Sequence, residues 1–429
     1  MSKLDRKIAP QFNDIEKIDY IKADYQVLKN GIPVYLINAG FQDICKIDFI
    51  FNAGIWHQTS PLVASSTNEM LAEGSKSRTS KEISETIDFY GAILNHFTDK
   101  DFAGLSLVTL NKHLDKTLDV LYDIIKNPVF PESELITHLQ NRKQQFIIDS
   151  AKTKTLAHRK FWNVLFGKNH PYGNNLELND FDNLDKKQLF DFHKRHYTAD
   201  NCKIIISGKI KSSVLKTVEK YFGDSNWQRK SKITEIIPAI SANSEKLHFI
   251  DKHDAVQSAI RIGKITINKY HEDFIGLQIL NTVFGGYFGS RLMSNIREDK
   301  GFTYGIGSAI GSMLHSGFFV IVTEVGADVT KATIKEIYKE MKILREELIG
   351  EEELKSVKSY IMGELLKIFD GPFALSDSFR SIIDFGLDYS YFDKYIETVK
   401  NINSGTLNVL ANKYLNDENL YEIIAGKYD

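Results

Sequence analysis

The sequence predicts an α+β protein made of two homologous domains, and three observations support this prediction. At 429 residues, the chain exceeds the size at which a single hydrophobic core usually stops growing. Short runs rich in β-branched and aromatic residues alternate with longer helical patterns in both halves. In addition, DFHKRHYTADNCKIIISGK (191–209) aligns without a gap with VLANKYLNDENLYEIIAGK (409–427). A period this long exceeds that of solenoid repeats, so it indicates a duplicated domain.

The duplication has two further marks in the sequence. Gly208 aligns with Gly426, which sets the offset between the two copies at 218 residues. AGLSLVTL (103–110) also matches SGFFVIVT (316–323), and each of these runs precedes a long charged helical pattern. Two matches in the same order are unexpected by chance, which strengthens the prediction of homologous halves.

The boundaries of the predicted domains follow from a polar stretch between the two copies. SNWQRKSKITEIIPAISANSEK (225–246) is polar and contains a proline, so we interpret it as a linker with room for one strand. This places an N-terminal domain at residues 1–224 and a C-terminal domain at residues 247–429.

Local signals in the first half predict individual elements. Thr79 and Glu82 are spaced as a capping box, and Gly91 is suited to a C-terminal stop, so a helix is expected near 80–90. Three short runs beside turn residues are typical of strands: PVYLIN (33–38), KIDFIFN (46–52) and FAGLSLVT (102–109).

Composition and charge identify no macromolecular partner. The 54 lysines and arginines nearly balance the 56 aspartates and glutamates, which disfavours a nucleic-acid partner. No run of about 18 apolar residues predicts a membrane span. Cys45 and Cys202 are far apart, and nothing in the sequence supports a disulfide between them. We therefore expect a cytoplasmic protein, or a periplasmic one if a leader has been removed.

Motifs for metal and nucleophilic chemistry are missing from the sequence. It contains neither HExxH nor HxxEH, and neither a GxSxG nucleophile elbow nor a Walker loop. His193 and His196 are three residues apart, but no acidic residue adjoins them. Because catalytic zinc needs a third ligand and a base, we interpret this pair as a solvated helix end.

The most distinctive stretch is FGGYFGSRLMSNIREDKGFTYGIGS (284–308). Its glycines allow a sharp turn or a close backbone approach. A turn of four residues separates Arg297 and Tyr304, and a guanidinium beside a phenol can donate to peptide carbonyls or to a developing oxyanion. The alternative from spacing alone is that Arg297 pairs with Glu298 or Asp299 while Tyr304 is simply packed.

The run at 285–308 resembles the C-terminal signature of the insulinase/pitrilysin peptidases, the inverzincins. NGIPVYLINAG (30–40) and HPYG (170–173) agree with this resemblance. It implies two α/β sandwich domains, each a mostly antiparallel sheet covered by helices, that form half of a clam-shell. It also implies that Arg297 and Tyr304 hold the substrate main chain opposite a zinc site on an N-terminal half.

The chain departs from this family at the zinc motif. Active members carry HxxEH before Met-Leu-x-x-Gly-Thr, and MLAEGS (70–75) fixes the register. The two histidine positions then fall on Ser65 and Glu69, and the general-base position falls on Asn68. The third ligand should lie near 142–146, where we consider only Lys143 and glutamine as candidates. A cation at a zinc-ligand position does not suit an intact site, so the resemblance implies no metal in this chain.

The resemblance therefore implies a function shared between two chains. We expect the non-zinc-binding subunit of a heterodimeric zinc metalloendopeptidase, inactive alone, that supplies substrate-binding Arg297 and Tyr304. Zinc is expected in the partner, an HxxEH-bearing homologous subunit, and the substrate is a peptide. Two alternatives remain: a catalytically silent scaffold or assembly subunit, and a homodimer that binds peptides without cleaving them.

Overall fold

The computed structural model describes residue 15 and residues 17–227, 237–241 and 243–428. Its first sheet is mixed, with strands in the spatial order β1-β2-β6-β3-β5-β4. Only the pair β2 and β6 is parallel, and the other neighbours are antiparallel. The strands are β1 (Asp24–Val27), β2 (Pro33–Asn38), β3 (Ile44–Phe51), β4 (Ile93–Thr98), β5 (Ala103–Leu110) and β6 (Cys202–Gly208).

The second sheet repeats this order without a counterpart of β1. Its strands run β7-β11-β8-β10-β9, and only β7 and β11 are parallel. The sequence repeat therefore places β6 and β11 at the same position in their sheets, and likewise β5 and β10. The strands are β7 (Leu247–Asp251), β8 (Gln257–Thr266), β9 (Ile306–Met313), β10 (Ser316–Gly326) and β11 (Tyr421–Gly426).

The aligned glycines show why the repeat is detectable in sequence. Gly208 and Gly426 end their strands with φ angles of 121° and 138°, a region that side-chain-bearing residues rarely adopt. A side-chain carbon at Gly208 would also lie 2.4 Å from the carbonyl oxygen of Ile44. Both halves thus need glycine at this point.

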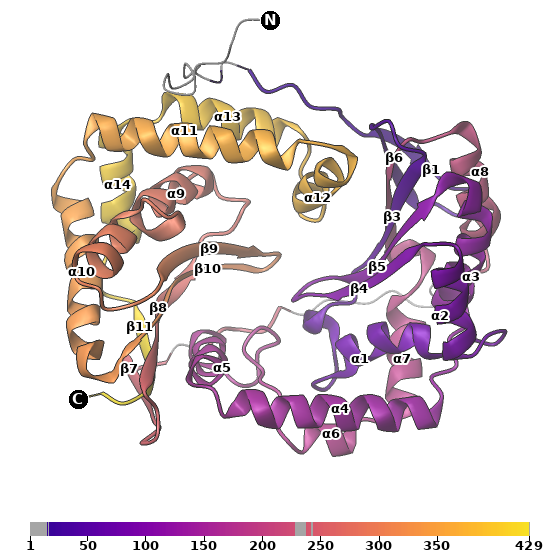
Figure 1. Cartoon of the computed structure of the whole chain (residues 1–429), viewed down its shortest axis with the longest axis horizontal. Coiled ribbons are helices and arrows are strands. Elements are labelled where there is room, and N and C mark those ends of the chain that lie inside the picture. The colour runs from indigo at the N-terminus through magenta and orange to yellow at the C-terminus, as the bar shows by residue number, and fades with distance from the viewer. Residues whose placement is uncertain (1–14, 16, 228–236, 242, 429) are drawn as a thin grey trace, which may run out of the picture.

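Helices cover the outer faces of both sheets (Figure 1). The predicted helix near 80–90 is confirmed as α2, where Thr79 and Glu82 form the capping box, and Gly91 follows with a φ of 60°. The first half contains α1 (Val63–Glu69), α2 (Ser80–Phe89), α3 (Leu114–Lys126), α4 (Glu132–Ser150), α5 (Thr153–Phe166), α6 (Asp180–Asn183), α7 (Lys186–His196) and α8 (Ser212–Phe222). The second half contains α9 (Phe274–Asn281), the π-helical segments η5 (Thr282–Gly286) and η6 (Met293–Asp299), α10 (Thr330–Glu346), α11 (Glu351–Ile368), α12 (Pro372–Ile383), α13 (Ser390–Asn401) and α14 (Ser404–Tyr414).

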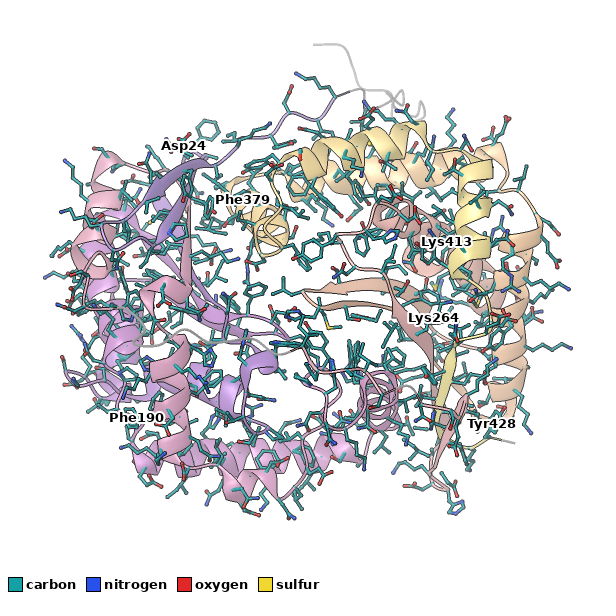
Figure 2. All side chains as sticks on the ribbon, turned by 180° about the vertical axis from the view of Figure 1, so that it is seen from behind. Asp24, Phe190, Lys264, Phe379, Lys413 and Tyr428 are labelled. Atoms are coloured by element: carbon teal, nitrogen blue, oxygen red, sulfur yellow. The ribbon has the colours of Figure 1, made fainter. Side chains whose placement is uncertain are left out.

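Short 3-10 segments connect several of these elements. They are η1 (Ile55–His57), η2 (Met70–Glu73), η3 (Asn111–His113), η4 (Ala199–Asn201) and η7 (Ala327–Val329). In Figure 2, Phe190 marks α7 and Lys413 marks α14, the two repeated helices, on opposite sides of the molecule.

Each half contributes one helix to the sheet of the other half. Helix α5 follows α4 but packs on β8 and β11, whereas α12 follows α11 but packs on β6 and β2. Both helices lie in the space between the two sheets (Figure 1), where Figure 2 labels Phe379 on α12. A carbon added at Gly263 of β8 would lie 2.9 Å from the Phe161 ring of α5, so glycine permits this close packing.

Polar contacts fix α12 on the first sheet. Lys46 of β3 forms an ion pair with Asp377 and another, at 3.3 Å, with the buried Asp48. Ser376 donates a hydrogen bond of 3.2 Å to Asp48. Because Lys46 and Asp48 are paired and largely removed from solvent, they favour one relative position of the two halves, whereas Asp377 stays 65% exposed.

The predicted boundaries at 224 and 247 stay a prediction. In the linker, residues 225–227, 237–241 and 243–246 contain no strand, and the rest lies outside the described residues. Cys45 and Cys202 are both buried and free. Among the described residues, no helix is long and apolar enough to cross a membrane.

Candidate functional site

Helix α1 carries Ser65 and Glu69, the positions that the resemblance assigns to the zinc-binding histidines of active family members. Ser65 and Glu69 are four residues apart, so they lie one turn apart on the same face of the helix. The helix continues into the 3-10 segment η2 and stops at Gly74, whose φ is 152°. The helix therefore forms although neither position carries a histidine.

A guanidinium occupies the position between these two residues. Nη1 of Arg142, on α4, donates to Oγ of Ser65 at 2.9 Å and to the carboxylate of Glu69 at 3.3 Å. We expected Lys143 to be the cation at the third ligand position, and this detail was wrong. Lys143 points elsewhere and pairs with Asp182 at 2.7 Å, because neighbouring residues on a helix face different directions.

Asn68, at the general-base position, is fully buried and hydrogen-bonded to its surroundings. Its Nδ2 donates to the carbonyl oxygens of Phe97 at 2.7 Å and Gly104 at 3.1 Å, and its Oδ1 accepts from the Tyr197 hydroxyl at 3.1 Å. A neutral amide used in this way joins α1 to β4, β5 and Tyr197, the residue after α7. It offers no base for proton abstraction.

Ser66, His138 and Glu69, beside this position, are arranged like a serine–histidine–carboxylate triad, but the serine is closed to substrate. Ser66 Oγ lies 3.0 Å from Nε2 of His138, whose Nδ1 lies 3.8 Å from Glu69. Ser66 is fully buried, so no substrate carbonyl can reach its hydroxyl. Burial, and after it the charge of Arg142, lowers the pKa of His138 to about 4. The arrangement is therefore packing between α1 and α4.

The residues at this position do not fit zinc. The two histidine positions supply a serine hydroxyl and one carboxylate, and a positive charge already lies against both. Within residues 17–227, 237–241 and 243–428, no group of three or more His, Cys, Asp or Glu side chains is placed to hold a metal ion.

The histidine pair on α7 also has a structural role. We expected a solvated helix end, but His196 is buried and its Nδ1 lies 3.2 Å from the Asn52 carbonyl oxygen. His193 Nε2 lies 2.7 Å from the Ile125 carbonyl oxygen. The interpretation as a solvated end was wrong because the end of α7 packs against strand β3 and helix α3.

In the second predicted pair of site residues, Arg297 lies in the π-helical segment η6 and Tyr304 lies on the loop that follows it. Nε of Arg297 donates to the carbonyl oxygen of Tyr304 at 3.1 Å, which ties the two residues together. Arg297 lies 3.8 Å from Glu298, but its side chain is still 34% exposed. Tyr304 is 94% exposed. Both side chains are thus presented to solvent.

Neighbouring residues hold this loop in place. Thr303 Oγ1 donates to the Glu324 carbonyl oxygen at 2.7 Å, and Thr323 Oγ1 lies 3.0 Å from Thr303 Oγ1. Both contacts anchor the loop to β10. The guanidinium carbon of Arg297 also lies 4.7 Å from the ring centre of Phe288, a cation–π distance.

Sequence reasoning did not select Phe288 or the two threonines as support for the pair. Phe288 lies inside the glycine-rich run that attracted attention, so its position before Arg297 could have suggested the contact. The threonine contacts join residues on different elements, and spacing gave no signal for them. A carbon at Gly285 would lie 2.5 Å from Ser308 Oγ, which confirms the close backbone approach expected of these glycines.

A small cavity of about 310 Å³ opens beside Tyr304. Its walls come from the Tyr304 loop, strands β8 and β10, and helix α5 of the first half. Its charged or polar lining side chains are Lys154, Gln257, Arg261, Thr303, Tyr304, Thr323 and Glu324.

Together, the sequence repeat and the two sheets define a peptidase-like protein with two homologous halves. Residues 34–168 match the family described as "Insulinase (Peptidase family M16)", and residues 183–361 match "Peptidase M16 inactive domain". The two matches span both halves. The chain belongs to the insulinase/pitrilysin family of peptidases.

Individual relatives agree with this assignment. A Rickettsia felis protein named "Uncharacterized zinc protease" is 27% identical over 400 residues, covering 90% of this chain and 93% of that protein. The Bacillus subtilis "Uncharacterized zinc protease YmxG" is 26% identical over 342 residues, which are 79% of this chain and 82% of that protein. The structure of a peptidase M16 inactive domain from Pseudomonas fluorescens superposes with a TM-score of 0.87 at 22% identity, over 95% of this chain and 98% of that one. This last likeness shows the fold.

Proposed function

We propose that this chain is the zinc-less subunit of a two-chain metalloendopeptidase. It would close a chamber with an HxxEH-bearing homologue and bring Arg297 and Tyr304 to the peptide. One contrast supports this proposal: Arg142 fills the metal position of the first half, whereas the second half presents Arg297 and Tyr304 to solvent. A chain that cannot hold zinc can still hold a peptide.

The Arg297–Tyr304 geometry suits binding to a peptide main chain. A guanidinium has five N–H donors, and the hydrogen bond to Tyr304 uses only the one on Nε. The terminal nitrogens can therefore donate to peptide carbonyl oxygens. The exposed Tyr304 phenol can donate to a carbonyl oxygen or to an oxyanion that forms on it. Zinc and the general base would come from the partner.

A silent scaffold subunit is the second candidate, and one observation favours it. The Arg142 contacts and the buried Asn68 make the former metal position a packed unit that needs no ligand. A purely structural chain would have the same feature. Such a chain, however, has no use for a loop that exposes a tyrosine almost completely.

The buried, free thiols of Cys45 and Cys202 fit a reducing compartment, and we propose a cytoplasmic location on this basis. A disulfide would have indicated an oxidising one. Fractionation of the cells that make the protein, followed by immunoblotting, tests the location directly.

Peptidase activity on an unstructured peptide tests the proposed function. The chain alone, the HxxEH homologue alone and their mixture are compared, and the mixture is repeated with Arg297→Ala or Tyr304→Phe in this chain. We expect cleavage by the mixture, no cleavage by this chain alone, and a loss of about 10-fold or more for either substitution. Size-exclusion chromatography of the mixture reports the complex.

A matched control separates a local effect from a general effect of charge. Arg195 is an exposed arginine on α7, in the other half, so Arg195→Ala should leave the rate unchanged. If the mixture cleaves equally well with Arg297→Ala and Tyr304→Phe, the pair has no role in the reaction and the scaffold function is the better account. Failure of the homologue to associate leads to the same conclusion.

A further inference from the structure

We propose that the cavity beside Tyr304 is a subsite for a carboxylate of the bound peptide, with Arg261 and Lys154 as its cationic ligands. The inference rests on the proposed function, because it assumes that a peptide passes Tyr304. It adds a substrate preference that the Arg297–Tyr304 pair alone does not provide. The carboxylate can come from an Asp or Glu side chain or from the C-terminus of the peptide.

The sheet determines where the Arg261 side chain lies. Gly263 faces the Phe161 ring of α5, and residues two apart on a strand share a face, so Arg261 lies on that same face of β8. In the antiparallel register, Arg261 is opposite Val322 of β10, which also lines the cavity. The guanidinium therefore belongs to the cavity, whereas α9 and α10 pack on other parts of the sheet, against β9 and β10.

Within the part of the chain that the structure describes, no carboxylate lies within ion-pairing distance of the Arg261 side chain. No ion pair within 4 Å and no hydrogen bond joins its side chain to a described residue. Glu324 lines the same cavity but is opposite Ala259, so it is diagonal to Arg261 across the two strands. Desolvation lowers the pKa of Arg261, and the charge of Glu324 offsets this only in part. A desolvated guanidinium is ready to accept a carboxylate.

The charges around the cavity favour an anion. Lys154, from the start of α5, adds a second cation, so two cations face the single carboxylate of Glu324. Desolvation, and after it the charge of Arg261, lowers the pKa of the nearby His158 to about 4. His158 is therefore neutral near pH 7 and adds no positive charge that could bind the carboxylate.

The size and place of the cavity fit one group of a peptide. A volume of about 310 Å³ is at the lower end of the range of ligand pockets, which is about 300–1,000 Å³. It admits a single side chain or a chain end. Because Tyr304 forms one wall, a peptide held at its main chain by Arg297 and Tyr304 has its neighbouring group beside Arg261. A planar guanidinium can bind both oxygens of that group.

Binding to the full-length chain tests the inference without any partner. The probes are four fluorescein-labelled, unstructured ten-residue peptides: one with a central Glu, one with Gln in its place, and each with a free or an amidated C-terminus. Fluorescence anisotropy gives the dissociation constants. We expect a preference of about 10-fold or more for a carboxylate, the size of a charge-assisted hydrogen bond. A preference that is lost when Gln replaces Glu comes from the side-chain carboxylate, and one that is lost on amidation comes from the C-terminus.

Four variants assign the preference to residues. Arg261→Met should abolish it, Lys154→Met should reduce it, and Glu324→Gln should increase it by removing the repelling carboxylate. Arg195→Met, in the other half, should change nothing. Thermal denaturation adds a second readout: an unpaired, desolvated Arg261 contributes no ion pair, so Arg261→Met should not lower the melting temperature.

The outcomes separate this inference from the proposed function. Equal binding of all four peptides, with Arg297→Ala still weakening every one of them, overturns the carboxylate subsite and leaves the main-chain role of Arg297 standing. A carboxylate preference that survives Arg261→Met also overturns the subsite. If none of the peptides binds, both the subsite and the peptide-holding role of this chain are refuted.

Discussion

Replacing Arg142 by methionine tests whether a guanidinium stabilises the former metal position. Its side chain is 31% exposed and donates to Ser65 at 2.9 Å. A charged hydrogen bond contributes about 1.5–3 kcal/mol, and we take the lower end because of this exposure. The pair with Glu69, which is 46% exposed, adds about 0.5 kcal/mol after solvent screening. Methionine keeps the apolar stem, so Arg142→Met should cost about 2 kcal/mol in total.

Urea denaturation followed by circular dichroism measures this loss as a change in the free energy of unfolding. Lys143→Met is the matched control, because Lys143 is the next residue on α4 and pairs with Asp182, which is 63% exposed. Its loss should be below about 0.5 kcal/mol. Equal losses for Arg142→Met and Lys143→Met would refute the argument that the guanidinium replaces the metal as the local cation.

Two more predictions concern the same region. The triple variant Ser65→His, Glu69→His and Arg142→Glu should create a zinc site, since these three side chains already contact one another. Equilibrium dialysis should find about one zinc per chain in this variant. It should find none in the double variant Ser65→His and Glu69→His, which keeps Arg142. Acidification from pH 7.5 to 5 should destabilise the protein by about 2 kcal/mol for each of His138 and His193, whose pKa burial lowers from 6.5 to about 4. Between these pKa values the unfolded chain binds more protons than the folded chain, so stability decreases as the pH decreases. Urea titrations that show no such loss at pH 5 would contradict this, and so would a His193→Gln variant that loses as much stability as the unchanged protein.

Much of the fold could be predicted because its signals are local. The capping box of Thr79 and Glu82 and the turn at Gly91 involve residues a few positions apart, so spacing alone identifies α2. The repeat was visible because Gly208 and Gly426 each end a strand in a conformation that suits glycine. Matching constraints in both halves preserved matching residues.

The candidate site was predicted less completely. Ser65, Asn68 and Glu69 followed from the register of the motif, and the structure places Ser65 and Glu69 on one face of α1. The choice of Lys143 over Arg142 was wrong because a helix turns about 100° per residue, so only a contact between α1 and α4 shows which cation faces inward.

By itself, the sequence determined the family and the two homologous halves, because these depend on residue identity and spacing. Only the tertiary structure decided that α5 and α12 exchange between the two sheets, and that Arg261, Lys154 and Tyr304 line one cavity. Lys154 comes from the first half and Arg261 from the second, and no local pattern encodes a contact between distant segments. The packing of α5 against β8 brings them together, and that packing is a property of the whole folded chain.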